Sequence, residues 1–250
     1  MLALSSRRVV DDRARLAPVA AVAKALGFRQ AFASAPPADS AAAKEVFAKV
    51  GISVVAVGAN AADGPATLTR EVGKAAEAAA ALGIRLVVAD AWPLPADATE
   101  AAREIAAQSL ARTIHGILSG REGLSLALRV ATDAEGLLGF REAEWLLGDL
   151  SHTAIGLWLE PARVESGARA GRGVRTLDWA DRFGARILGV TIAPPETGGG
   201  LGRPEDSGVD WGTLRESVPS RAARVVDVGP KASDAEVFDL RRRFEEVLGW

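Results

Sequence analysis

Residues 153–163, TAIGLWLEPAR, combine an apolar run with an abrupt charged end. The run 155–159 carries no charge, and charged side chains appear only beyond it, at Glu160 and Arg163. This is typical of an inner strand of an α/β barrel, because such a strand lies among packed side chains while its carboxyl end faces a solvent-filled pocket. The stretch predicts a buried strand and makes Glu160 and Arg163 the first candidates for a functional site.

Strand-like and helical segments alternate along the rest of the chain. The predicted strands cover residues 2–4, 29–34, 52–57, 84–89, 124–130, 155–159, 186–192 and 223–228. The predicted helices cover residues 13–26, 38–50, 67–82, 97–118, 140–147, 176–183, a short segment from 211, and 234–248. Residues 164–172 are predicted to be a polar loop rich in Arg and Gly, and 193–209 the longest loop.

Eight strand–helix pairs predict a parallel sheet closed into a (β/α)8 barrel. The alternative is a doubly wound open sheet, but no glycine fingerprint follows the first strand. A length of 250 residues suits one barrel, and no linker or composition shift divides the chain. We therefore predict a single α/β domain over residues 1–250.

Composition narrows the class of protein. Hydrophobic residues make up 48% and charged residues 25%, as in soluble globular proteins. The net charge of -2 provides no basic field for nucleic acid. The absence of cysteine excludes disulfides and thiolate chemistry and fits a reducing cytoplasm. No signal peptide or membrane span is apparent, so we expect a cytoplasmic protein without a nucleic-acid or membrane partner.

Six segments together resemble one family of barrels. They are AVAKALGF (21–28), GISVVAVGAN (51–60), GLSLALRV (123–130), IGLWLEPAR (155–163), ARILGVTIAP (185–194) and SGVDW (207–211). In order and spacing they resemble the xylose isomerase-like TIM barrels, which include sugar-phosphate isomerases and epimerases and, more remotely, endonuclease IV-type enzymes. The resemblance implies a barrel of that type and an activity in carbohydrate metabolism.

The resemblance also implies a divalent metal, held at the carboxyl end of the barrel by a Glu, an Asp, a His and a second Glu. In the family this ion polarises the sugar while carboxylates move a proton. The corresponding positions of this sequence are, in the same order of strands, Arg129, Glu160 with Arg163, Val190 or Thr191, and Asp227.

This ligand set departs from the family at nearly every position. Hard divalent cations prefer oxygen or imidazole ligands, and a guanidinium repels the ion and does not deprotonate. The chain has only two histidines, His115 and His152, and both precede a predicted strand. We therefore expect a degenerate metal site, with neither the family metal nor another cofactor.

The remaining charged residues at the strand exits have two interpretations. Arg129 and Arg163 are predicted to grip an anionic ligand, with Glu160, Asp90 and Asp227 as candidates for proton transfer. Alternatively, Arg129 neutralises one of these carboxylates in an internal salt-bridge cluster.

Further candidates lie at other strand exits. Trp92 is either a sugar-stacking face or a packed indole, and Asp90 either a general base or a helix cap. Arg7 follows the first strand and Lys231 the eighth, where barrels often cradle phosphate, so both are candidate ligand-binding residues. Asp210 is predicted to cap the helix that begins at Trp211.

Two functions follow from these residues. The first is isomerisation or epimerisation, or binding, of a small anionic sugar or sugar acid at the carboxyl-terminal mouth of the barrel, without a metal. The second is a non-catalytic barrel, a pseudoenzyme that binds a ligand or a partner protein. The oligomeric state is left open. Endonuclease-like DNA processing would need several metal ions and a basic face, and the sequence shows neither.

Overall fold

The structure is a computed structural model. It describes residues 1–5, 17–95, 97–130, 138–149, 154–194, 196–197, 200–201, 203–228, 232–247 and 249–250.

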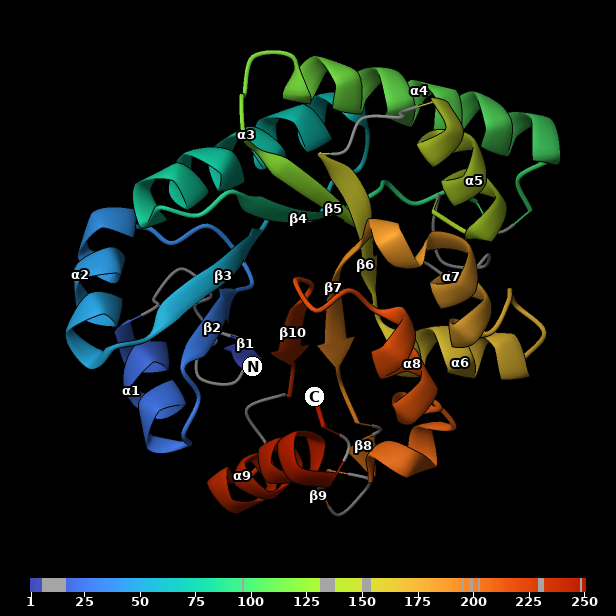
Figure 1. Cartoon of the computed structure of the whole chain (residues 1–250). Coiled ribbons are helices and arrows are strands. Elements are labelled where there is room, and N and C mark those ends of the chain that lie inside the picture. The colour runs from blue at the N-terminus through green and yellow to red at the C-terminus, as the bar shows by residue number, and fades with distance from the viewer. Residues whose placement is uncertain are drawn as a thin grey trace.

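Eight parallel strands form a closed barrel at the centre of the molecule (Figure 1). They are β1 (Ala3–Ser5), β2 (Gln30–Ala33), β3 (Ser53–Gly58), β4 (Leu86–Asp90), β5 (Ser125–Arg129), β6 (Ile155–Leu159), β7 (Ile187–Ile192) and β10 (Ala223–Val226). The order around the barrel is β1-β10-β7-β6-β5-β4-β3-β2, and β1 closes it by pairing with both β2 and β10. The prediction of a closed (β/α)8 barrel is confirmed, and each of the eight predicted strands is present.

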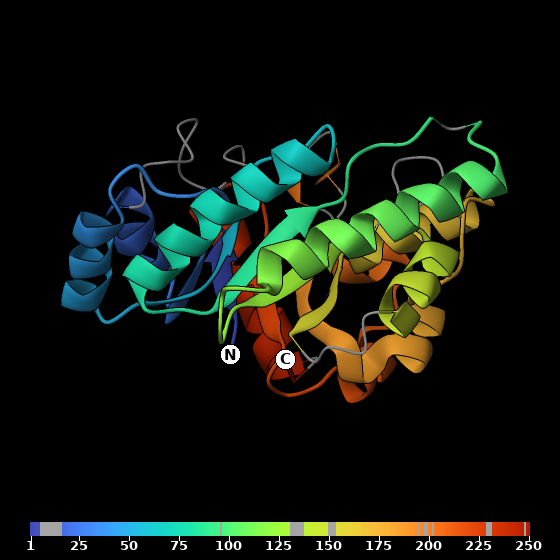
Figure 2. The same cartoon turned by 90° about the horizontal axis from the view of Figure 1, so that it is seen from above.

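Helices surround the barrel. They are α1 (Ala17–Ala25), α2 (Ser40–Val50), α3 (Pro65–Leu82), α4 (Glu100–Leu118), α5 (Phe140–Asp149), α6 (Pro161–Arg169), α7 (Thr176–Phe183), α8 (Trp211–Ser217) and α9 (Asp234–Arg242). The two longest, α3 and α4, lie side by side on the outside of the sheet (Figure 2). Within the described residues, no helix is long and apolar enough to cross a membrane.

Local signals explain where these helices begin and end. The Asp39 side chain accepts a hydrogen bond from the backbone N–H of Ala42 at the start of α2, over 2.9 Å. Gly51 ends that helix with φ 73°, a left-handed conformation that glycine adopts without steric cost. Asp210 caps α8 as predicted, since its Oδ1 accepts from the N–H of Thr213 over 3.0 Å.

The prediction of a polar loop over residues 164–172 is wrong, because most of this segment belongs to helix α6. Pro161 occupies the first turn, where its missing N–H costs nothing. Val164 and Glu165 are buried on one side of the helix, and Glu165 accepts hydrogen bonds from the side chain of Arg175 and the N–H of Thr176. Arg and Gly suggested a loop, but the arginines of this helix lie on its exposed side.

The predicted loop 193–209 also contains regular structure. Two short antiparallel strands, β8 (Glu196–Thr197) and β9 (Gly200–Leu201), pair with each other, and Pro204–Ser207 forms a 3-10 turn. At the other end of the chain, α9 continues as a π-helical turn over Arg243–Val247.

The interior of the barrel is filled largely by the indole of Trp158. Seven strands each contribute one residue to a small buried cluster, separate from the larger core between sheet and helices: Ala3, Phe32, Ala56, Val88, Ala127, Trp158 and Val225. The Trp158 ring stacks on Phe32 at a centroid distance of 5.4 Å, and its Nε1–H donates to Thr191 Oγ1 over 2.7 Å. Gly189 lies opposite the ring, where a Cβ atom would overlap it. A large aromatic side chain therefore fits because the adjacent strand carries no side chain at this point.

Candidate functional site

The carboxyl ends of β4, β5 and β6 bring three of the predicted site residues together. Asp90 and Arg129 are register partners across β4 and β5, and Glu160 directly follows β6. Arg129 Nη1 lies 2.9 Å from Asp90 Oδ2, and Arg129 Nε lies 3.5 Å from Glu160 Oε1. One guanidinium thus links two carboxylates across three adjacent strands.

Arg163 extends this group from the first turn of α6. Its Nη1 donates to Glu160 Oε2 over 3.1 Å. We call Asp90, Arg129, Glu160 and Arg163 the mouth cluster. Two negative and two positive groups alternate in it, and the side chains of Arg129 and Glu160 are the deepest, with 17% and 21% of their surface exposed. These ion pairs are the contacts that the salt-bridge interpretation of the mouth expects, and ligand binding by the arginines stays a prediction.

The barrel interior just beneath the mouth cluster carries a buried polar contact that the sequence did not indicate. Trp158 precedes Glu160 by two residues on β6 and therefore points to the same face of the sheet. Its indole N–H is satisfied by Thr191, of which 6% is exposed. The sequence places Trp158 within the predicted strand 155–159 but does not indicate its partner. The available signal was the indole itself, because a buried tryptophan needs an acceptor for its N–H.

Other predicted residues take separate positions. Asp227 follows β10 at the same end of the barrel, with its N–H donating to the carbonyl of Ile192 over 3.0 Å. In strand order it lies two strands from Glu160. Arg7 and Lys231 lie outside the described residues.

The structure bears on the interpretations of two residues at the exit of β4, Asp90 and Trp92. The helix that follows β4 is capped by Thr99, whose Oγ1 accepts from the N–H of Ala102 over 3.3 Å, so Asp90 is not its cap. Trp92 is 7% exposed and belongs to the hydrophobic core, as its interpretation as a packed indole requires. Asp90 pairs with Arg129 in the structure, and its role as a general base stays a prediction.

Metal-ligating side chains are sparse in this arrangement. Within the described ranges, no three His, Asp or Glu side chains gather so as to hold a metal ion. His115 lies in the last turn of α4, which leads to the amino end of β5 and away from the mouth.

The buried carboxylate of Glu71 supports the exit of the neighbouring strand β3. Asn60 follows β3, and its amide donates to Glu71 Oε2 on α3 over 3.0 Å. Glu71 Oε1 accepts from Arg70 Nε and Lys74 Nζ, each over 2.9 Å. These hydrogen bonds, that of Arg70 first, lower the pKa of Glu71 from 4.5 to about 2. Only 6% of the side chain is exposed, so the group ties the exit of β3 to its helix.

We expect Glu71→Gln to destabilise the fold in a pH-dependent way. The folded-state pKa lies below the ordinary value, so ionised Glu71 stabilises the protein above about pH 4.5, and that contribution is lost as the pH falls towards 2. The free energy of unfolding should drop by about 1–2 kcal/mol at pH 7, and the difference from wild type should shrink below pH 4.5. Urea unfolding at several pH values measures this. Glu77→Gln, an exposed change on the same helix, is the control, and a difference that stays constant with pH would contradict the prediction.

Comparison with known proteins defines the class of fold. No protein-family model and no curated protein sequence matches the chain. Solved structures match it over its whole length, and the chain has the xylose isomerase-like TIM barrel fold.

Three of these structures illustrate the likeness. A xylose isomerase domain protein from Alicyclobacillus acidocaldarius superposes with a TM-score of 0.71 at 16% identity, covering 100% of this chain and 99% of that one. A D-psicose 3-epimerase gives 0.74 at 13% identity, with 100% and 99% covered. An L-ribulose 3-epimerase gives 0.74 at 15% identity, with 99% and 94% covered. The structural neighbours thus include sugar epimerases.

Proposed function

We propose that the mouth cluster binds a small anionic sugar or sugar acid and isomerises or epimerises it without a metal ion. The observation that carries this proposal is the guanidinium of Arg129, held between Asp90 and Glu160. It lies at the carboxyl end of the barrel strands, where TIM-barrel enzymes have their active sites. The sugar epimerases among the structural neighbours support the same class of substrate.

Arg129 has donors to spare for a ligand. A guanidinium carries five N–H donors, and within the described residues the contacts of Arg129 engage Nη1 and Nε. The Nη2 group is then available to hold a carboxylate or to polarise a carbonyl oxygen. In an aldose–ketose conversion, Glu160 takes the proton from the carbon beside the carbonyl and returns it to the neighbouring carbon. Asp90 moves the hydroxyl proton, and Arg129 stabilises the charge on oxygen.

The family metal does not fit the mouth cluster. The residue that corresponds to the first metal-ligating glutamate is Arg129, and a guanidinium has no lone pair to offer a cation. A divalent ion between Asp90 and Glu160 would meet the charge of Arg129 at the same place. We therefore derive no step through a metal.

A non-catalytic barrel is the second candidate, and one observation favours it. The carboxylates of Asp90 and Glu160 are both already paired with Arg129. Removing one partner of such an ion pair destabilises the folded protein, so these pairs persist in proteins even where they have no catalytic role. In this case the barrel binds a ligand or a partner protein without turnover.

Ligand binding and solvent exchange separate the two candidates. We expect sugar phosphates and sugar acids, for example D-ribulose 5-phosphate and D-gluconate, to raise the melting temperature. Arg129→Met should weaken binding by roughly tenfold or more. Glu160→Gln should retain binding but reduce the exchange of substrate C–H for deuterium, followed by proton NMR in D2O, by about a hundredfold or more.

Arg141→Met is the matched control, because Arg141 pairs with Glu100 on the exposed outer helices. Binding without any deuterium exchange would establish the non-catalytic alternative. If no anionic sugar in the panel binds, or if Arg141→Met weakens binding as much as Arg129→Met, the proposal for this mouth is wrong.

A further inference from the structure

An open cavity lies at the end of the barrel opposite the mouth cluster. It is bordered by α8, by residues 218–220 that lead into β10, and by the first part of β10. All eight barrel strands run parallel, so the amino end of β10 is at the face opposite the strand exits. The cavity measures about 430 Å³ and shares no lining residue with the mouth cluster.

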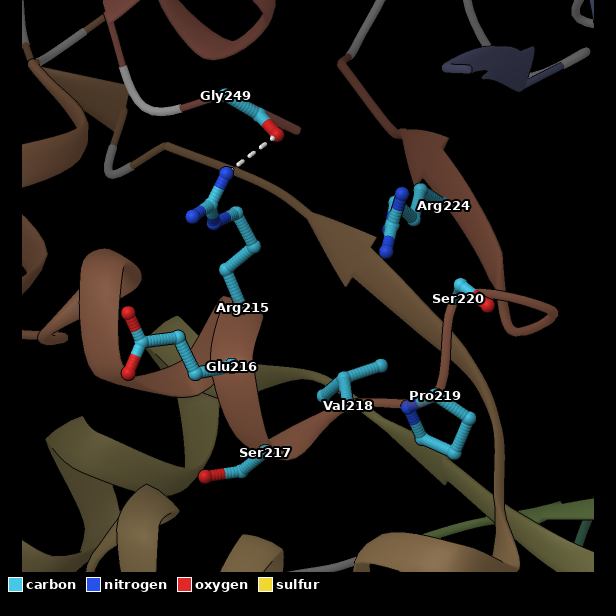
Figure 3. Close-up of a pocket in the computed structure, with 8 residues that line it drawn as sticks. All are labelled: Arg215, Glu216, Ser217, Val218, Pro219, Ser220, Arg224 and Gly249. Carbon is cyan, nitrogen blue, oxygen red and sulfur yellow. Dashed lines mark hydrogen bonds between the residues drawn. The ribbon is translucent and has the colours of Figure 1, made fainter.

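Two arginines flank this cavity (Figure 3). Arg215 extends from α8, where its Nη1 donates to the carbonyl of Gly249 over 3.1 Å. Arg224 extends from β10, and its guanidinium carbon lies 5.2 Å from the ring centroid of Trp250. The hydrogen bond fixes the side chain of Arg215, and the cation–π contact fixes that of Arg224. Val218 and Pro219 lie on the segment that joins α8 to β10, below both guanidiniums in this view (Figure 3).

The positive charge here lacks a carboxylate to balance it. Within the described part of the chain, neither arginine forms an ion pair, and the buried Nε of Arg224 has no hydrogen-bond acceptor. Glu216 also lines the cavity, but its carboxylate points away from both guanidiniums (Figure 3). Burial first, and then the charge of Arg215, lowers the pKa of Arg224 from its ordinary value. A buried donor without an acceptor is costly, and an anion beside the two guanidiniums balances their charge.

We propose that this cavity binds a small organic oxyanion, with its phosphate or carboxylate group between Arg215 and Arg224. The guanidinium forks of the two arginines match the geometry of both groups. The apolar side chains of Val218 and Pro219 contact the carbon part of the ligand. This site is additional to the one proposed at the mouth, and it needs none of the mouth residues.

Titration of the full-length protein with inorganic phosphate, and separately with acetate, tests the proposal. In ¹⁵N-labelled wild-type protein, the Nε–Hε resonance of Arg224 should shift and saturate with at least one of the two anions. Arg215→Gln and Arg224→Gln should each weaken that anion by roughly tenfold to a hundredfold. A response to phosphate alone identifies a phosphate group, and a response to acetate alone identifies a carboxylate.

Arg221→Gln is the matched control, because it removes the same charge at a position next to Ser220 that does not line the cavity. The Arg221 side chain instead donates to the carbonyl of Ala185. It should bind as wild type does. Equal affinities in all four proteins, or a wild-type shift that never saturates, would mean only general screening by salt and would overturn the proposal. Should Arg224→Gln not fold, Arg224→Lys keeps the charge but lacks Nε–H, and it must still bind more weakly than wild type.

Discussion

Replacing Gly189 with alanine is expected to destabilise the barrel by about 3 kcal/mol or more. An ideal Cβ at this position overlaps the six-membered ring of Trp158 at Cζ3 and Cε3. The ring has no room to retreat, because it is fully buried, stacks on Phe32 and donates to Thr191. Accommodating the methyl group therefore breaks the hydrogen bond or moves β7 away from β6.

Urea unfolding of the single and double variants measures this effect. Trp158→Leu in the Gly189→Ala background should cost much less than in the wild type, since the smaller side chain relieves the overlap, and the difference gives the coupling energy. Gly116→Ala is the control: Gly116 lies exposed in α4 with open space around it, so alanine should stabilise by up to about 1 kcal/mol. A Gly189→Ala protein as stable as wild type would show that the indole does not fill the barrel in this way.

Arg129→Glu is expected to turn the mouth cluster from an ion-pair network into a cation site. The substitution places a third carboxylate beside Asp90 and Glu160, and three oxygen ligands without a cation repel one another. We expect the variant to be less stable than wild type in the presence of a chelator. Manganese should restore stability as its concentration rises, by about 2.7 kcal/mol at a hundredfold excess over the dissociation constant.

Melting temperatures at increasing manganese concentration, together with elemental analysis after dialysis, measure this. Arg129→Gln serves as the control, because it removes the positive charge without adding a ligand, and it should show the smaller response. Arg163→His added to Arg129→Glu supplies an imidazole next to Glu160 and should tighten binding further. Stoichiometric metal in wild-type protein purified without chelator would refute the metal-free mechanism.

The sequence predicted most of the architecture and much of the mouth cluster. The strands were found because each is a short apolar run between helices, and a charge just beyond such a run marks the mouth of a barrel. Asp90 and Glu160 fit that rule, whereas Arg129 lies inside the predicted strand 124–130 and was singled out by the family resemblance. The structure brings the three within ion-pair distance. Their roles in binding or proton transfer stay predictions.

Three features escaped the sequence for identifiable reasons. The sequence predicts a loop over most of helix α6. The contacts that hold this helix join the buried Glu165 to Arg175 and Thr176, which lie well beyond it along the chain. The contact between Trp158 and Thr191 joins two strands, so the sequence indicates that a buried indole needs an acceptor but not which residue supplies it. The cavity flanked by Arg215 and Arg224 likewise depends on the tertiary arrangement of α8 and β10.

The three-residue strand β1 has a consequence for how the chain reaches its fold. Ala3 pairs with Val225, so the last seam of the barrel joins the two most distant parts of the sheet. Closing so long a loop is entropically costly and slows folding. Until both terminal segments are in place, β2 and β10 are open edges, and open edges pair readily with other chains. The three residues of β1 thus protect the sheet against association between partly folded molecules.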